Sequence, residues 1–195
     1  MADVNLFTIL MDGIFVKNFL VIQFLGLCSF LGVTKATESA KGMSMAVVFV
    51  MVMASIAAFV INTYILRTFG LTFLTTIAYI IVIAFLVQLV EFVIRKNSPG
   101  LYRSLGIYLP LITTNCAILG VVVLNTRLEY TFVQSVVHGI AAGIGYTLVM
   151  LFLAAMREKA EVLKVPASIQ GIPHAFFITT MYAMAFVNYF GVIPT

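Results

Sequence analysis

Long apolar runs separated by short polar connections are the dominant pattern along this chain. Six such runs lie at 5–33, 43–66, 71–94, 101–124, 131–155 and 172–193. Each is long enough to cross the hydrocarbon of a bilayer as a helix, which takes roughly 20 apolar residues. The connections are TKATESAK, RTFG, RKNSPG, NTRLEY and REKAEVLKVPASIQG, which carry charges or turn-forming residues. The pattern predicts an all-α integral membrane protein with six transmembrane helices in a single membrane domain, 1–195.

Composition supports this class and excludes several others. Hydrophobic residues make up 63% of the chain and charged residues only 9%, far from the composition of soluble domains. The first run lacks a basic leading region and a small-residue cleavage pattern, so we expect it to be retained rather than removed as a signal peptide. The net charge of +4 resides mainly in the connections, where membrane topology explains it, and no nucleic-acid partner is implied.

The distribution of basic residues predicts the orientation in the membrane. Connections two and four hold only Arg67 and Arg127. Connections one, three and five together hold eight basic residues, namely Lys35, Lys41, Arg95, Lys96, Arg103, Arg157, Lys159 and Lys164. Short cytoplasmic loops carry an excess of Lys and Arg. The sequence therefore predicts that both termini lie outside.

Two of the six runs are expected to be broken helices. The first has 29 residues, which would measure ~44 Å as one straight helix, against a hydrocarbon core of roughly 30 Å. Gly13 and the polar pair Lys17-Asn18 offer a break there. The fourth run contains Pro110, which lacks a backbone donor, followed by the polar stretch 113–115. Each of the chain's two cysteines follows one of these interruptions.

The two cysteines share a local signature. A shift of 88 residues places Cys28 of FLGLCSFLGV on Cys116 of TTNCAILGV, and the Leu-Gly-Val that follows each also aligns. We interpret this as an internal repeat, approximately 1–95 and 96–195. A repeat unit of three spans ends on the opposite side of the membrane from where it begins, so the second copy must have the inverted orientation. The prediction is therefore two inverted three-helix repeats with broken helices 1 and 4. Cys28 and Cys116 would then be neighbours near the membrane midplane.

Two buried thiols have three interpretations. Free cysteine commonly packs as a small apolar side chain. A disulfide is disfavoured, because such bonds belong to oxidising compartments. The third interpretation is thiolate ligation of a metal. A [2Fe-2S] cluster usually takes four cysteines and structural zinc four ligands, whereas this chain has two Cys and two His. A cluster would need two ligands from a second membrane subunit.

The segments FLGLCSFLGV, LYRSLGIYLPLITTNCAILGV and VQLVE carry a resemblance that covers essentially the whole chain. They resemble the A subunit of the Rnf electron transport complex, whose sister family is the E subunit of the sodium-translocating NADH:quinone oxidoreductase. The Thr-Thr-Asn-Cys form at 113–116 and the short second connection favour Rnf over the sister complex. The segment from His174 to Thr195 is less typical of the family.

The resemblance implies a redox-driven, ion-translocating complex that exchanges electrons between ferredoxin and NAD and moves sodium ions or protons. It further implies that this subunit pairs with the homologous E subunit, beside the B, C, D and G subunits, in a bacterial inner membrane. In the family the pair holds one [2Fe-2S] cluster with two cysteines from each chain, and the matching positions here are Cys28 and Cys116. The chain is not expected to be catalytic alone. A secondary transporter and a structural anchor are the competing hypotheses, because inverted repeats with broken helices also build substrate carriers.

Ionisable residues inside apolar runs are functional candidates, because charges are costly in a bilayer. Asp12, Lys17, Glu91 and His138 are therefore candidates for an ion path. Each also has a structural interpretation. Asp12 and Lys17 can pair at the helix break, Glu91 can pair with Arg95 four residues on, and His138 can be a hydrogen-bonded bundle residue. The glycines of HGIAAGIG predict close helix packing.

Overall fold

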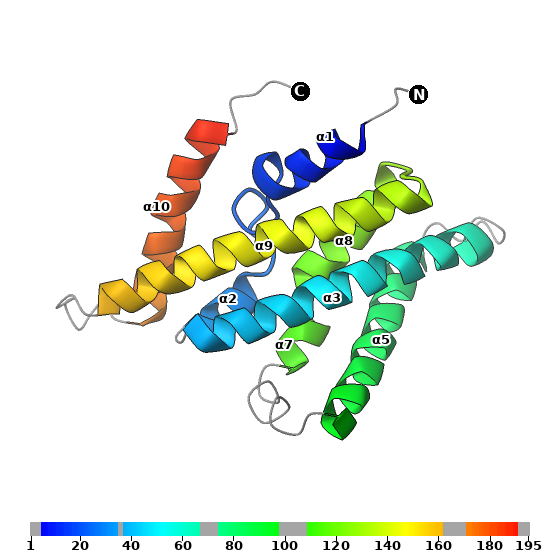
Figure 1. Cartoon of the computed structure of the whole chain (residues 1–195), viewed down its shortest axis with the longest axis horizontal. Helices are drawn as coiled ribbons and strands as arrows, with labels where there is room; N and C mark the ends of the chain where they lie inside the picture. The colour runs from blue at the N-terminus through cyan, green and yellow to red at the C-terminus, as the bar shows by residue number, and fades with distance from the viewer. Residues whose placement is uncertain (1–4, 35–36, 67–73, 98–108, 162–170, 191–195) are drawn as a thin grey trace.

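The computed structural model of the chain describes residues 5–34, 37–66, 74–97, 109–161 and 171–190. Over these residues every regular element is helical, and each of the six apolar runs is helical over part of its length (Figure 1). The predicted all-α class is thereby confirmed. Lys35, Arg103, Lys164 and the connection RTFG, with Arg67, lie outside the described residues.

The first apolar run is broken, as the sequence predicts. It begins as α1 (Leu6–Met11), widens into the π-helical turn η1 (Asp12–Val16), leaves helical geometry at Lys17, and resumes as α2 (Leu27–Val33). Between the two helices the chain crosses the protein interior with Phe19, Leu20 and Val21 almost fully buried. Irregular backbone is tolerated at membrane depth only where protein surrounds it, so these apolar side chains anchor the break inside the bundle.

The fourth run is interrupted in a similar way. It consists of α7 (Leu109–Thr113) and α8 (Cys116–Arg127), separated by two residues. Asn115 caps α8, because its side-chain oxygen accepts a hydrogen bond from the Ala117 N–H at 3.0 Å. The Thr114 hydroxyl donates to the Pro110 carbonyl at 2.8 Å. The polar residues that predict the break therefore satisfy the backbone groups that it frees.

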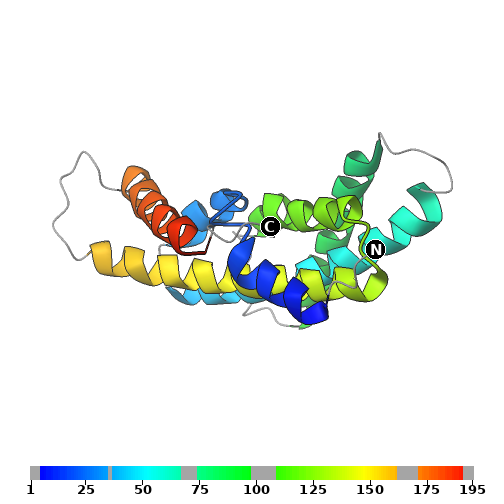
Figure 2. The same cartoon turned by 90° about the horizontal axis from the view of Figure 1, so that it is seen from above.

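Two long helices form the frame of the molecule. α3 (Thr37–Ile61), continued by the π-helical turn η2 (Asn62–Leu66), lies beside α9 (Phe132–Glu161). Figure 2 shows these two helices in the lower layer of the view, with α2 and α8 in a second layer above them. α5 (Thr75–Asn97) and α10 (Ile172–Phe190) lie toward opposite ends of the frame (Figure 1).

Glycines on α9 allow these close approaches, as the HGIAAGIG segment predicts. A Cβ atom at Gly139 would lie 2.7 Å from Ser55 Oγ, and one at Gly143 would lie 3.2 Å from the Val48 Cα of α3. At Gly145 the same atom would lie 3.0 Å from the Gly13 carbonyl oxygen of the broken first helix. Small residues therefore let α9 contact α3 on one face and the N-terminal break on another.

Within the described residues, four helical stretches are long and apolar enough to cross a membrane: Ser39–Tyr64, Thr75–Phe92, Pro110–Arg127 and Phe132–Ala160. Two shorter apolar helices, Leu6–Val16 and Ile172–Phe186, occupy the first and last predicted runs. The chain is an all-helical multi-pass membrane protein. Six complete spans in two inverted repeats stay a prediction.

Several helices extend beyond the apolar runs that predict them. α3 begins at Thr37, so Lys41 is helical although the sequence places it in the first connection. Arg95 and Lys96 lie in the last turn of α5, and Arg157 lies within α9. Lys, Arg and Glu are good helix formers, so a helix continues past its apolar stretch until a breaker ends it. The apolar pattern therefore marks the apolar length of each helix rather than its ends.

Replacing Gly143 by leucine tests the packing of α9 on α3. The new side chain meets the Cα and both Cγ atoms of Val48, and we expect a cost of about 1–3 kcal/mol, as for overpacked sites generally. The thermal unfolding midpoint of the purified protein is expected to fall. Ala155→Leu, on an exposed position of the same helix, is the matched control and leaves the midpoint unchanged. Equal midpoints for the two variants would contradict the close approach.

Candidate functional site

The two cysteines meet where the two broken helices resume. Cys28 is the second residue of α2, and Cys116 is the first residue of α8. The two cysteines are neighbours, although 88 residues separate them in the chain, because the backbone two residues before Cys28 contacts Cys116 Sγ. The predicted proximity is confirmed. Both cysteines are free thiols, and both are exposed on the surface of this chain.

Gly26 forms a turn that holds the two thiols together. Its backbone N–H donates a hydrogen bond to Cys116 Sγ at 2.9 Å, which ties the first break to the start of α8. The residue has φ 88°, in the left-handed region that favours glycine. A Cβ atom at this position would lie 3.0 Å from the Tyr146 ring and 3.4 Å from Ala117 Cβ. Both the turn and the crowding therefore require glycine.

Tyr146 supports this turn from beneath, a role that the sequence analysis missed. Its side chain is fully buried on α9, and its hydroxyl lies 2.8 Å from Ser29 Oγ. The Ser29 hydroxyl in turn donates to the Gly26 carbonyl at 2.7 Å. The sequence feature that could have indicated this role is a tyrosine directly after the glycine-rich face of HGIAAGIGY. A tyrosine buried there needs a polar partner for its hydroxyl.

The glycines of the shared Leu-Gly-Val signature pack reciprocally. A Cβ atom at Gly32 of α2 would lie 3.0 Å from Leu111 of α7, and one at Gly120 of α8 would overlap Leu25 of the first break. Each glycine therefore leaves room for a leucine that precedes the other cysteine. This explains why the same residue type follows both cysteines at the same spacing.

The surroundings of the thiols leave the ligand set of a metal incomplete. Among the residues that the structure describes, no group of three or more His, Cys, Asp or Glu side chains is placed to hold a metal ion. Cys116 lies on a mainly apolar cavity of about 310 Å³ between α5 and the α7–α8 break, lined by Ile80, Ile83, Ala84, Thr113, Thr114, Asn115 and Leu119. Two exposed thiols beside an apolar surface can serve as one half of a site completed by another chain.

The remaining candidates lie apart from the thiol pair. Asp12 and Lys17 form an ion pair, Oδ2 to Nζ 2.8 Å, across η1, as the structural interpretation of these residues predicts. Glu91 lies on α5, half-buried, two helical turns beyond Ala84. Its pairing with Arg95 stays a prediction. The structure therefore does not bring these three residues to one centre with the cysteines.

His138 is a buried, hydrogen-bonded residue of the bundle. Its Nδ1 contacts Asn125 Oδ1 of α8, and its ring packs edge-on against Phe19 and Tyr130 at centroid distances of 5.9 and 5.5 Å. The Asn125 amide in turn donates to Ser55 Oγ and to the Ser135 carbonyl, both at 3.4 Å. This matches the structural interpretation, and a proton-relay role stays a prediction.

Arg157 has an unexpected position. Its place in the chain predicts a charge in the fifth connection, but its side chain is only 3% exposed. Its guanidinium donates to Thr34 Oγ1 at 2.8 Å and to the Leu31 carbonyl at 3.5 Å, at the end of α2. A cation there complements the carbonyl end of the short cysteine-bearing helix. Only the tertiary contact between α9 and α2 reveals this role.

Together these features define a class: a multi-pass helical membrane protein with paired thiols at the meeting point of two broken helices. Comparison with known families identifies the group within that class. A family described as "Rnf-Nqr subunit, membrane protein" matches residues 6–193. The chain belongs to this Rnf-Nqr family of membrane subunits, in agreement with the resemblance seen in the sequence.

Curated relatives match over nearly their whole length. One from Methanosarcina acetivorans, named as the A subunit of an "ion-translocating oxidoreductase complex", is 61% identical over 191 residues, covering 97% of this chain and 96% of the relative. A protein of the same name from Serratia proteamaculans is 51% identical over 180 residues, covering 92% and 93%. The relative from Acetobacterium woodii, named as the A subunit of a "Na(+)-translocating ferredoxin:NAD(+) oxidoreductase complex", is 46% identical over 187 residues, covering 96% and 97%.

Gly26→Ala tests the turn between the cysteines. A non-glycine residue in the left-handed conformation costs roughly 1–2 kcal/mol, and the added methyl group also contacts Tyr146. We expect a lower thermal unfolding midpoint. Gly32→Ala is the matched control, because Gly32 is helical and its added methyl group meets only the flexible end of Leu111. A midpoint no lower in Gly26→Ala than in the control would contradict the assigned turn.

Proposed function

We propose that this chain is an electron-carrying membrane subunit of an ion-translocating ferredoxin:NAD oxidoreductase complex. Cys28 and Cys116 supply two of the four thiolate ligands of a [2Fe-2S] cluster, and a homologous membrane subunit supplies the other two. The observation that carries the proposal is the proximity of two exposed thiols at the junction of two broken helices. The names of the relatives support membership of such a complex.

The chemistry of the thiol pair fits an iron–sulfur cluster. Cysteine thiolates are the ordinary ligands of [2Fe-2S] clusters, and hydrogen bonds to sulfur tune their potentials. The Gly26 N–H already donates to Cys116 Sγ, which is the type of backbone donor such a site uses. When bound, the cluster supplies one-electron transfer within the bilayer. The role of this chain is to hold two sulfur ligands in a fixed relative position.

Sharing the cluster follows from the count of ligands. The chain has two cysteines, both exposed, so a complete ligand set requires a second chain seated over them. A homologous subunit with the same pair would place its thiols opposite across a pseudo-symmetric interface. In the Rnf resemblance this partner is the E subunit, with the B, C, D and G subunits carrying the remaining redox groups.

Ion movement is the second part of the proposal. The names of the relatives describe ion translocation, and that of the Acetobacterium woodii protein specifies sodium. Broken helices that meet inside a bundle are also the elements that secondary transporters use to bind ions. We propose that Na⁺ or H⁺ movement is coupled to electron transfer at the thiol pair, with Asp12, Lys17, Glu91 and His138 as candidates for the path.

Electron paramagnetic resonance of the purified complex tests the electron-carrying role. We expect Cys28→Ser and Cys116→Ser each to abolish one [2Fe-2S] signal and to lower the iron content by about two atoms per complex, as expected for one binuclear cluster. Thr180→Val is the control, because it changes an exposed polar residue of α10 and leaves both thiols and the Gly26 turn in place.

The same variants separate the competing functions. A full signal in both cysteine variants, with the complex still assembled, would refute the cluster. Ion uptake that survives the cysteine changes without any lost signal would favour a transporter. Loss of assembly alone would favour a structural anchor.

We also propose an inner-membrane location with both termini outside, because the basic residues of connections one, three and five then lie in the cytoplasm. A C-terminal alkaline phosphatase fusion is expected to be active, and a C-terminal green fluorescent protein fusion dark. A control fusion after Lys159, at the end of α9, should show the reverse pattern. The same phosphatase activity and fluorescence for fusions at the two positions would contradict this orientation.

A further inference from the structure

The hydroxyl of Tyr146 lies beside both cysteine-bearing segments at once. It is 2.8 Å from Ser29 Oγ, on the residue that follows Cys28. It also lies near the side chain of Asn115, the residue that precedes Cys116. Both thiols are close enough to this hydroxyl to interact with it electrostatically. One side chain of α9 therefore reaches the residue beside each of the two cysteines.

Tyr146 and its polar neighbours are enclosed by the bundle. Tyr146 and Ser29 are fully buried, and Asn115 is only 3% exposed, so water does not compete for their hydrogen bonds. Gly145, directly before the tyrosine, brings α9 close to the first break. A Cβ atom at this glycine would lie 3.0 Å from the Asn18 amide nitrogen. The close approach of α9 therefore places the phenol beneath the thiols.

A chain of hydrogen bonds runs from Tyr146 to the sulfur of Cys116. The Ser29 hydroxyl uses its one proton to donate to the Gly26 carbonyl at 2.7 Å. The Tyr146 O–H is therefore the donor in its bond with Ser29 Oγ. Gly26, held in this way by its carbonyl, donates its own N–H to Cys116 Sγ at 2.9 Å. Tyr146 thus acts on this sulfur through two intervening residues.

Asn115 has one hydrogen-bond donor left over at this place. Its backbone N–H donates to the Ile112 carbonyl, and its backbone carbonyl accepts from the Ile118 N–H. Its Oδ1 caps α8 by accepting from the Ala117 N–H. Its Nδ2 makes no hydrogen bond of normal geometry to the described residues. An unpaired buried donor is costly, and a redox role is one explanation for such a group, because a donor stabilises negative charge on nearby thiolates.

From these contacts we propose that Tyr146 is a positioning residue for both cysteine ligands and that it sets the reduction potential of the cluster they hold. An N–H that donates to sulfur stabilises negative charge there, and this charge is larger after the cluster accepts an electron. Hydrogen bonds to sulfur therefore raise the reduction potential. The hydroxyl acts through Ser29 and Gly26, so it needs no direct bond to the cluster. The inference rests on the proposed function, because it concerns the same thiols.

Tyr79 separates this role from a purely structural one. It is also fully buried, on α5, and its hydroxyl lies 2.7 Å from Thr126 Oγ1. At 1.5 Å per residue, Thr126 lies roughly 15 Å along α8 from Cys116. Each tyrosine thus makes one buried hydrogen bond to another hydroxyl group. Only Tyr146 lies beside the thiols.

Tyr146→Phe and Tyr79→Phe, each made in the whole purified complex, test the proposal. A redox titration followed by electron paramagnetic resonance gives the midpoint potential and the g values of the [2Fe-2S] signal. Thermal unfolding of the same samples reports the loss of a buried hydrogen bond. Ser29→Ala is a second test variant, because it breaks the chain of hydrogen bonds at the next link and keeps the tyrosine.

We expect Tyr146→Phe and Ser29→Ala to keep the signal and to shift its midpoint potential to more negative values. A smaller fraction of the cluster is then reduced at the wild-type midpoint potential. Tyr79→Phe should lower the thermal unfolding midpoint about as much as Tyr146→Phe does, with the potential and the g values of the wild type.

An unchanged or more positive potential in Tyr146→Phe and Ser29→Ala, or an equal negative shift in Tyr79→Phe, would overturn the proposal. If Tyr146→Phe does not assemble, the potential of Ser29→Ala decides alone. A signal that survives both cysteine changes would instead refute the cluster itself. Failure of this inference and failure of the proposed function are therefore different results.

Discussion

The need to satisfy backbone hydrogen bonds away from water is the constraint on which the rest of this structure depends. Two helices stop inside the bundle, and each break exposes N–H and C=O groups that lipid cannot satisfy. At the first break the Asn18 side chain satisfies two of these backbone groups. Its amide oxygen accepts a hydrogen bond from the Leu20 N–H, and its amide nitrogen donates one to the Ile14 carbonyl. At the second break the Asn115 side-chain oxygen accepts a hydrogen bond from the Ala117 N–H. Each break is stable only because it is enclosed by the rest of the chain.

The burial of the two helix breaks inside the bundle explains why the two cysteines lie close together. The first break is buried against α8 and α9, and this fixes the Gly26 turn against Cys116. Glycines on α9 and on both cysteine-bearing helices provide the room, while Tyr146 and Ser29 supply the hydrogen bonds. The thiol pair is therefore a consequence of how two interruptions are packed. A rigid pair of sulfur atoms at the surface suits a cofactor that a second chain completes.

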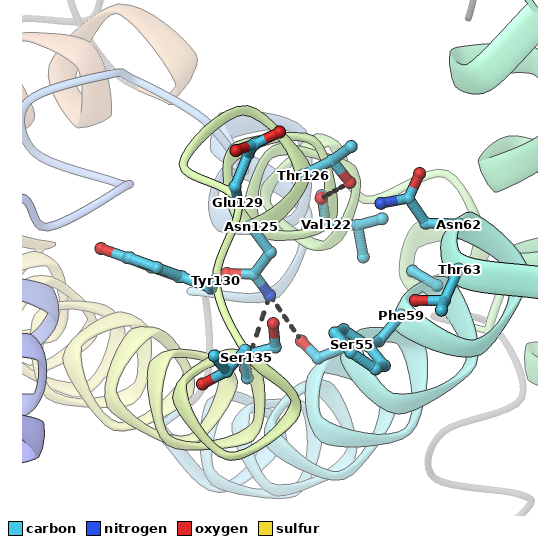
Figure 3. Close-up of a pocket in the computed structure, with 12 residues that line it drawn as sticks. Ser55, Phe59, Asn62, Thr63, Val122, Asn125, Thr126, Glu129, Tyr130 and Ser135 are labelled. Carbon is cyan, nitrogen blue, oxygen red and sulfur yellow. Dashed lines mark hydrogen bonds between the residues drawn. The ribbon is translucent and has the colours of Figure 1, made fainter. Parts of the chain in front are cut away.

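The thiol pair and a polar cavity around Asn62, Asn125 and Thr126 lie at opposite ends of α8, and both are built from irregular backbone (Figure 3). π-helical turns and left-handed residues are costly to maintain and are concentrated at functional sites. Here η1 carries the Asp12–Lys17 pair, η2 and Glu129 line the cavity, and Gly26 holds the thiols. The regular helices α3 and α9 form the frame that keeps these irregular segments in place.

The sequence by itself determined the membrane class, the apolar runs and the positions of both breaks, because apolar length and helix-breaking residues are local properties. The repeated Leu-Gly-Val after each cysteine also indicated that Cys28 and Cys116 belong together. The tertiary structure alone decided that Tyr146 supports the Gly26 turn, that Arg157 lies at the end of α2, and that a polar cavity forms around Thr126. These contacts join residues up to 126 positions apart, and no local pattern of polarity encodes which helix faces meet.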